Sequence, residues 1–563
     1  MSESEFSPTR SNMKTRFLIS ITAALFAASN TIPAQNPDRA KVIAGAERAF
    51  EKASKAVTMP APGCAVGVSL NGESVFEKAF GLAEMEHNIA NTPQTIFESG
   101  SVAKQFTAAA LVLLQQEGKL NLDDEVRKYI PELPDYGSPL TIRHLLNHTA
   151  GLRDWGAVMS LTGAGRGDRV ISQALAVDVI LRQKFVDFKP GSEYSYSNSG
   201  YQLAAEIVER VSKQKFPAFV AERIFKPLGM TNSSTRDNYQ RIVAGRAQAY
   251  SRQGPNAPWE LNMPFMNVYG NGGMLTTVGD WLKWNAMLDG RTWNPSLVDA
   301  LETQGVLNDG YKIQYALGLT VGNYKGLRDV SHGGSTAGYQ TFLARYPDQK
   351  LSVAVMCNGT SPSAGGLAAS VTDEILGPFP EGPKPPAAIS VPEEQLKRFV
   401  GIWRNDKTHL PARITFENGA LRFAGQSMRP IAEGTFLIGG DEVKFTYDKD
   451  DRPIACEGRG PSGGMMRFVA EREWTPTAAA LKEFAGDWYS NEAQARVTFA
   501  IKGDKAFIVN KPVLRLQLQP IYKDHFMGQG YVIWVTRDRN GKVERLHVGT
   551  GRMRDMLFER VKK

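Results

Sequence analysis

A serine and a lysine three positions apart could serve as a nucleophile and the base that activates it. Residues 96–114 change from a strand-like run into a pattern rich in Ala and Leu, and Ser101 stands where a helix is expected to begin. Residues three apart share one helix face, so the Lys104 amine can lie against the Ser101 hydroxyl. A lysine accepts that proton only when burial or a nearby cation lowers its pKa. The pair predicts a serine hydrolase with Ser101 as nucleophile and Lys104 as base.

The Ser-x-x-Lys spacing is weak evidence alone, because it also occurs at Ser11 and at Ser212. The first of these lies in an expected signal region, and the second lies on a charged helix face. Only Ser101 begins an apolar helix after a strand-like run. A helix N-terminus also favours an anion at that point.

The surroundings of Ser101 resemble the serine β-lactamase and D,D-peptidase superfamily. The closest branch contains class C β-lactamases, D,D-carboxypeptidases, related esterases and D-aminopeptidases. The resemblance covers roughly residues 42–376 and includes Leu-Leu-Asn-His-Thr-Ala-Gly-Leu at 145–152 and Gly-Gly-Met-Leu-Thr-Thr-Val-Gly-Asp at 272–280. It implies an α/β domain with an antiparallel sheet flanked by helices. The polar residues of these segments and their flanks are expected to be structural: His144, His148 and Asp280.

The family's second element is Tyr-x-Asn. Three candidates occur: Tyr196-Ser-Asn198, Tyr269-Gly-Asn271 and Tyr489-Ser-Asn491. Only the first has the family context, Tyr-Ser-Tyr-Ser-Asn-Ser-Gly-Tyr followed by a helix. The resemblance therefore implies that Tyr196 passes a proton to the leaving group and that Asn198 holds the lysine or the substrate amide.

The third element, normally Lys-Thr-Gly, corresponds to the segment at His332. The resemblance implies that His332 replaces the lysine and that Gly334 lets the strand edge approach the acyl group. The Ser335 N–H would form the oxyanion hole with the Ser101 N–H. Gly333 stands where the family has Thr or Ser, a hydroxyl that helps bind a substrate carboxylate. This departure disfavours β-lactamase and D,D-carboxypeptidase activity.

The chain divides at a proline-rich linker, expected at 377–391. A hydrolase domain is expected at 35–376 and a signal region at 1–34. After the linker, Leu-Lys-Arg-Phe-Val-Gly-Ile-Trp at 396–403 recurs as Leu-Lys-Glu-Phe-Ala-Gly-Asp-Trp at 481–488. Alternating strands split by turn residues predict two small antiparallel, lipocalin-like β-barrels at 392–474 and 475–563. Trp403 and Trp488 are expected in the barrel cores, with ligand binding as the alternative.

Residues 17–28 form an apolar run after basic residues, which predicts export to the periplasm or the exterior, with an uncleaved membrane anchor as the alternative. Otherwise no integral membrane segment is expected. Cys64 and Cys357 are expected on neighbouring strands as buried free thiols rather than as a bridge. The formal charge of +8 is small for 563 residues, and basic residues do not cluster with aromatics, so nucleic acid is excluded.

No metal-binding spacing occurs, so neither a metal nor another cofactor is expected. The architecture resembles three-domain D-aminopeptidases, in which a barrel loop can reach the catalytic cleft. The resemblance implies a D-aminopeptidase that acts on a small D-residue amide. The alternatives are a carboxylesterase, then a β-lactamase or D,D-carboxypeptidase, and a non-catalytic sensor that binds ligands through its barrels. The oligomeric state is left open.

Overall fold

The computed structural model describes residues 37–163, 169–379, 385–460, 463–510 and 514–562. The expected signal region lies outside these residues, as does part of the proline-rich linker. Within the described residues, no helix combines the length and the apolar character needed to cross a bilayer.

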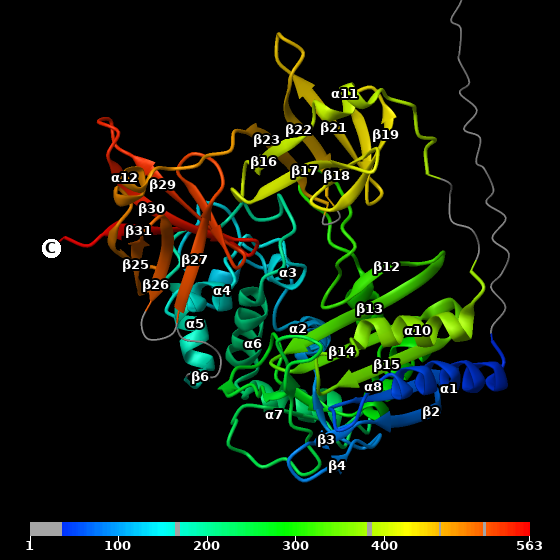
Figure 1. Ribbon diagram of the computed structural model, residues 1–563. Helices are drawn as coiled ribbons and strands as arrows, with labels where there is room; N and C mark the ends of the chain where they lie inside the picture. The colour runs from blue at the N-terminus through cyan, green and yellow to red at the C-terminus, as the bar shows by residue number, and fades with distance from the viewer. Residues whose placement is uncertain (1–36, 164–168, 380–384, 461–462, 511–513, 563) are drawn as a thin grey trace, which may run out of the picture. The chain divides into compact units, whose positions relative to one another are not determined.

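The first part of the chain is built around a six-stranded antiparallel sheet (Figure 1). Its strands follow one another in the order β12 (Thr320–Tyr324), β13 (Leu327–Thr336), β14 (Tyr339–Tyr346), β15 (Leu351–Cys357), β1 (Cys64–Leu70) and β2 (Glu73–Phe80).

The central strands are buried on both faces, because helices cover each side of the sheet. Side chains alternate along a strand, and Val66 and Val68 pack with helices α1 (Arg39–Lys55) and α10 (Ala364–Leu376), which lie side by side (Figure 1). Gly67 faces helix α8 (Val278–Gly290) on the other side, where a Cβ would lie 3.1 Å from Val278. The continuous apolar run in β1 follows from this double cover.

Cys64 and Cys357 are direct partners on β1 and β15 and form a disulfide. The expected placement on neighbouring strands is confirmed, whereas the expected free thiols are wrong. That expectation rested on burial alone. The register of two strands far apart in the chain decides whether the thiols meet, and here their Cα atoms lie 4.0 Å apart.

The other side of the sheet carries a helical region. It contains α2 (Lys104–Gln116), α3 (Ile142–Leu146), α4 (Trp155–Ser160), α5 (Gln173–Leu181), α6 (Asn198–Ser212), α7 (Phe216–Val220) and α9 (Pro295–Glu302). Short strands join its loops: β3 (Leu82–Glu84) with β4 (Ile89–Ala90), β6 (Ile171–Ser172) with β10 (Met266–Asn267), β8 (Tyr250–Ser251) with β9 (Glu260–Leu261), and β11 (Met274–Thr276) between β5 (Phe97–Glu98) and β7 (Ser234–Thr235).

Two closed antiparallel barrels follow, each preceded by a short helix, which confirms the expected fold class. Barrel 1 follows α11 (Glu393–Lys397) and comprises β16 (Gly401–Asn405), β17 (Pro411–Glu417), β18 (Ala420–Phe423), β19 (Gln426–Ala432), β20 (Thr435–Ile438), β21 (Asp441–Tyr447), β22 (Pro453–Arg459) and β23 (Met465–Glu471). Barrel 2 follows α12 (Ala478–Lys482) and comprises β24 (Gly486–Ser490), β25 (Ala495–Lys502), β26 (Lys505–Asn510), β27 (Leu514–Pro520), β28 (His525–Gly528), β29 (Tyr531–Arg537), β30 (Val543–Thr550) and β31 (Met553–Arg560).

The internal repeat reappears as the same local structure in both barrels. Trp403 and Trp488 are buried, and each indole N–H donates to the carbonyl four residues earlier, at Phe399 and Phe484. Both tryptophans therefore belong to the barrel cores, and their polar atom is satisfied within the barrel.

Candidate active site

Ser101 lies in a 3-10 turn, residues Gly100–Ala103, and α2 begins at Lys104 rather than at the serine. Side chains three apart eclipse each other in a 3-10 helix, which aligns the pair more closely than an α-helix would. The Lys104 Nζ lies 3.1 Å from the Ser101 Oγ. The structure thus brings the two residues into hydrogen-bond contact, as their spacing predicts.

The Lys104 amine has two further partners, which fit a neutral amine. Its Nζ lies 2.9 Å from the Asn198 Oδ1 and 2.7 Å from the Asn271 carbonyl oxygen. A neutral amine has two N–H groups for these two acceptors and one lone pair for the Ser101 hydroxyl. Burial lowers the pKa of Lys104 well below its ordinary value, and the charge of Arg552 adds to this, while Asp154 opposes it. Lys104 is therefore arranged to take the proton of Ser101.

Asn198 is held in one orientation by Asp154. The Asp154 Oδ2 accepts hydrogen bonds from the Asn198 backbone N–H and from its Nδ2, each at 2.8 Å. This leaves the Asn198 Oδ1 for Lys104. Asp154 also caps α4 through the Gly156 N–H. Asp154 was not predicted from the sequence, because its only local signal is that of a helix cap before Trp155.

Tyr196 lies beside the amine, with its ring centroid 4.9 Å from the Lys104 Nζ. Burial raises the pKa of Tyr196 above its ordinary value, and the neighbouring Ser101 hydroxyl offsets only part of that rise. Its own hydroxyl has no hydrogen-bond partner among the described residues. The ring of His148 packs against Tyr196 at 4.1 Å between centroids. Tyr196 is thus a neutral phenol with a proton to give, and His148 packs behind it.

His332 lies on β13 with both ring nitrogens engaged. Its Nε2 is 2.9 Å from the Tyr315 hydroxyl, and its Nδ1 is 2.6 Å from the Gly333 carbonyl oxygen. A neutral ring that donates from Nδ1 and accepts at Nε2 satisfies both contacts. Burial, together with the nearby Lys104, lowers the pKa of His332 to about 4. At neutral pH, His332 therefore lacks the charge of the family lysine at this position.

Two glycines let β13 approach the nucleophile. A Cβ on Gly334 would lie 2.1 Å from the Ser99 carbonyl oxygen, and a Cβ on Gly100, whose φ is +51°, would lie 2.5 Å from the Ser335 nitrogen. The space beside Gly334 thus belongs to Ser99 rather than to an acyl group. The segments of Ser101 and Ser335 approach closely, as the oxyanion hole requires, and that role stays a prediction.

One cavity of about 620 Å³ joins these groups. Six of the predicted site residues line this cavity: Ser101, Tyr196, Asn198, His332, Gly334 and Ser335. Lys104 is buried next to Ser101.

The other two Tyr-x-Asn segments do not place their tyrosines in the cavity. The Tyr269 hydroxyl donates to Glu209, and only the Asn271 segment reaches the site. Tyr489 is partly exposed in barrel 2.

Arg552 also lines this cavity, although it belongs to barrel 2. It lies in the turn between β30 and β31, and its guanidinium carbon is 4.9 Å from the centre of the Tyr196 ring. No pattern around Arg552 distinguishes it from other arginines in the chain. The sequence predicted a barrel loop near the cleft only by resemblance and did not identify it.

The fold and the site define a serine hydrolase of the Beta-lactamase family, whose model matches residues 50–375, so the chain belongs to that family. It is 27% identical to a D-aminopeptidase of Gluconobacter oxydans over 89% of this chain and 96% of the relative. It is 29% identical to penicillin-binding protein 4* of Bacillus subtilis over 67% of this chain and 89% of that protein. The octameric penicillin-binding protein homologue from Pyrococcus abyssi has a similar fold, with a TM-score of 0.53, 22% identity and coverage of 85% of this chain and all of that one.

The charges around Lys104 predict opposite shifts of the pH profile in two variants. With Lys104 as the general base, catalysis needs its neutral amine, so kcat/KM is expected to fall as the pH drops through the pKa of Lys104. Asp154 raises this pKa, and Arg552 lowers it. Asp154→Asn is therefore expected to move the acid limb to lower pH, and Arg552→Gln is expected to move it to higher pH. Profiles of kcat/KM on an uncharged ester test this, and shifts in the same direction would contradict the assignment of Lys104 as the base.

Proposed function

We propose that this chain is a serine peptidase of the D-aminopeptidase type, which cleaves small amides at a D-residue through an acyl-enzyme on Ser101. The main support is the Lys104 amine, whose two N–H groups are directed to carbonyl oxygens at 2.9 and 2.7 Å while Ser101 lies at 3.1 Å. The similarity to a D-aminopeptidase along nearly the whole chain supports the substrate class.

In the proposed reaction, the Ser101 Oγ attacks the amide carbonyl carbon while its proton passes to the Lys104 Nζ. The oxyanion of the tetrahedral intermediate is stabilised by the Ser101 and Ser335 N–H groups. The C–N bond then breaks, and the departing nitrogen takes a proton from the Tyr196 hydroxyl, which regains one from Lys104. Water then attacks the acyl carbon and gives a proton to the Lys104 Nζ. The bond from the acyl carbon to the Ser101 Oγ breaks, the Oγ regains a proton from Lys104 or Tyr196, and the acid leaves.

A carboxylesterase is the second candidate, because the same groups would serve it and an ester leaving group needs less help from an acid. The buried Tyr196 hydroxyl favours the peptidase, since a phenol held neutral beside the nucleophile is suited to protonating an amine. β-Lactamase activity is less favoured, because Gly333 lacks the carboxylate-binding hydroxyl.

Initial rates on three substrates separate these candidates: D-alanine p-nitroanilide, acetyl-D-Ala-D-Ala and p-nitrophenyl butyrate. Release of p-nitroaniline from the free-amine anilide is expected for a D-aminopeptidase. Turnover of the ester alone would replace the proposal with a carboxylesterase. Turnover of acetyl-D-Ala-D-Ala alone would indicate a carboxypeptidase.

We also propose that the protein works outside the cytoplasm. The Cys64–Cys357 disulfide supports this, because such bonds persist mainly in oxidising compartments. Fractionation of cells that express the chain with and without residues 1–34 checks it. Equal cytosolic retention of both forms would contradict export.

A further inference from the structure

The turn between β30 and β31 is fixed to the Ser101 domain at its tip. The Asp154 backbone N–H donates to the Arg552 carbonyl oxygen at 2.9 Å, and the Arg552 N–H donates to the Thr550 Oγ1 at 3.2 Å. Asp154 is also the residue that orients Asn198. The backbone of Arg552 is therefore tied to a residue that supports the catalytic amine.

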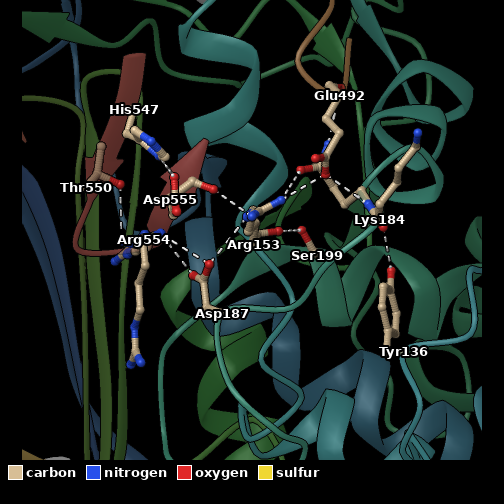
Figure 2. Close-up of polar contacts among 12 residues, drawn as sticks. Tyr136, Arg153, Lys184, Asp187, Ser199, Glu492, His547, Thr550, Arg554 and Asp555 are labelled. Atoms are coloured by element: carbon tan, nitrogen blue, oxygen red, sulfur yellow. Dashed lines mark hydrogen bonds and ion pairs between the residues drawn. The ribbon is translucent and has the colours of Figure 1, made fainter. Parts of the chain in front are cut away.

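A buried ion network fixes the strands behind this tip, and Figure 2 shows Arg153 at its centre. The Arg153 guanidinium contacts Glu492 at 2.9 Å and Asp187 at 3.4 Å, and it donates to the Asp555 carbonyl oxygen at 2.6 Å. The Arg554 backbone N–H donates to the same Asp187 carboxylate. These contacts hold β31 and the β24–β25 loop of barrel 2, so the position of the β30–β31 turn at the cavity is set by charged groups with little exposure.

The cavity has an excess of positive charge among its described residues. Its one lining carboxylate, Glu98, is bound by Arg236 through two hydrogen bonds of 2.8 and 2.9 Å and by Arg246 at 3.2 Å. Arg552 forms no ion pair with any carboxylate in the described part of the chain. Its guanidinium lies over the Tyr196 face, which leaves its N–H edges for another partner.

We propose that Arg552 binds a carboxylate of the substrate, so that the enzyme selects small D-residue amides that carry an anionic group near the scissile bond. This inference rests on the proposed function, whose substrate class it narrows. A guanidinium matches a carboxylate with two parallel hydrogen bonds.

Three matched substrate pairs locate the carboxylate. The first pair is the α-p-nitroanilides of D-glutamate and D-glutamine, which differ in the acyl side chain. The second is succinyl-D-alanine p-nitroanilide and its methyl ester, which differ in the carboxylate of the succinyl group attached to the alanine nitrogen. The third is acetyl-D-Ala-D-Ala and its C-terminal amide, which differ in the leaving group. The ratio of kcat/KM within a pair removes any effect of a variant on Ser101 and Lys104, because both members use the same groups.

The anionic member is expected to be preferred in at least one pair. Arg552→Gln should lower that ratio about 10- to 100-fold, the range of a hydrogen-bonded charge pair, and Arg552→Glu should bring it below one. Arg545→Gln is the matched control, because it removes the same charge from an exposed position on β30 outside the cavity lining. Ratios at or below one in all three pairs, or ratios that Arg552→Gln leaves unchanged, would overturn the proposal.

Calorimetry measures the binding of the same pairs to two proteins, the Ser101→Ala variant and the double variant Ser101→Ala with Arg552→Gln. Tighter binding of an anionic member that depends on Arg552 would support the inference even if no amide is hydrolysed. In that case only the proposed reaction fails. Equal dissociation constants for both members of every pair would overturn the inference independently of turnover.

Discussion

Replacing Ser101 with Ala is expected to lower kcat by about 10⁴-fold or more, because nothing else in the site could replace the oxygen that we propose forms the acyl-enzyme. The Lys104 amine would keep its contacts with Asn198 and Asn271, so the fold should be unaffected. Steady-state rates and a thermal melt of the same preparation measure the two properties.

The matched control for this prediction is Ser335→Ala. Ser335 is expected to contribute its backbone N–H, which alanine keeps, so kcat should change by no more than about tenfold. Wild-type turnover by Ser101→Ala would disprove the acyl-enzyme. A loss in Ser335→Ala as large as that in Ser101→Ala would show that the Ser335 hydroxyl, rather than its N–H, takes part.

Replacing Arg153 with Met is expected to destabilise the protein by about 3–5 kcal/mol, since it leaves buried carboxylates without their cation. The side chains of Arg153, Asp187 and Glu492 are 7%, 4% and 13% exposed. Burial already raises the pKa of Asp187 even with Arg153 in place, so loss of the guanidinium should raise it further. The denaturant midpoint measures the change in stability.

Arg143→Met serves as the control for the loss of an arginine. Arg143 pairs with Asp123, whose side chain is 62% exposed, and such a surface pair contributes about 0–1 kcal/mol. An equal, small effect of both substitutions would mean that the buried network does not hold barrel 2 to the Ser101 domain.

The residues that act together within one turn could be predicted from the sequence, and those that meet across the fold could not. Ser101 and Lys104 share a turn, so their contact follows from local geometry. Asn198 was found because a recognisable segment contains it. Asn271 contributes a backbone carbonyl, which every residue has, and so it left no signal.

For the barrels too, local features could be predicted from the sequence and long-range contacts could not. Their number and strand type follow from the repeat and the alternation of apolar residues. Arg552 of barrel 2 contacts the ring of Tyr196, which belongs to the Ser101 domain. The Cys64–Cys357 bond depends on the register between two strands that are far apart in the chain. Such contacts are fixed by packing of whole elements, which no short window of sequence records.

The distance along the chain between Ser101 and Arg552 has a consequence for biosynthesis. They are 451 positions apart (552 minus 101). At about 5–20 residues per second, a ribosome needs about 20 to 90 seconds to pass from one to the other. A nascent chain therefore carries its nucleophile long before the barrel 2 turn that completes the cavity. Until barrel 2 is made, Arg153 lacks the Glu492 carboxylate and the Asp555 carbonyl oxygen, and Asp187 lacks the Arg554 N–H. The newly made Ser101 domain therefore exposes charged groups that are buried in the finished protein.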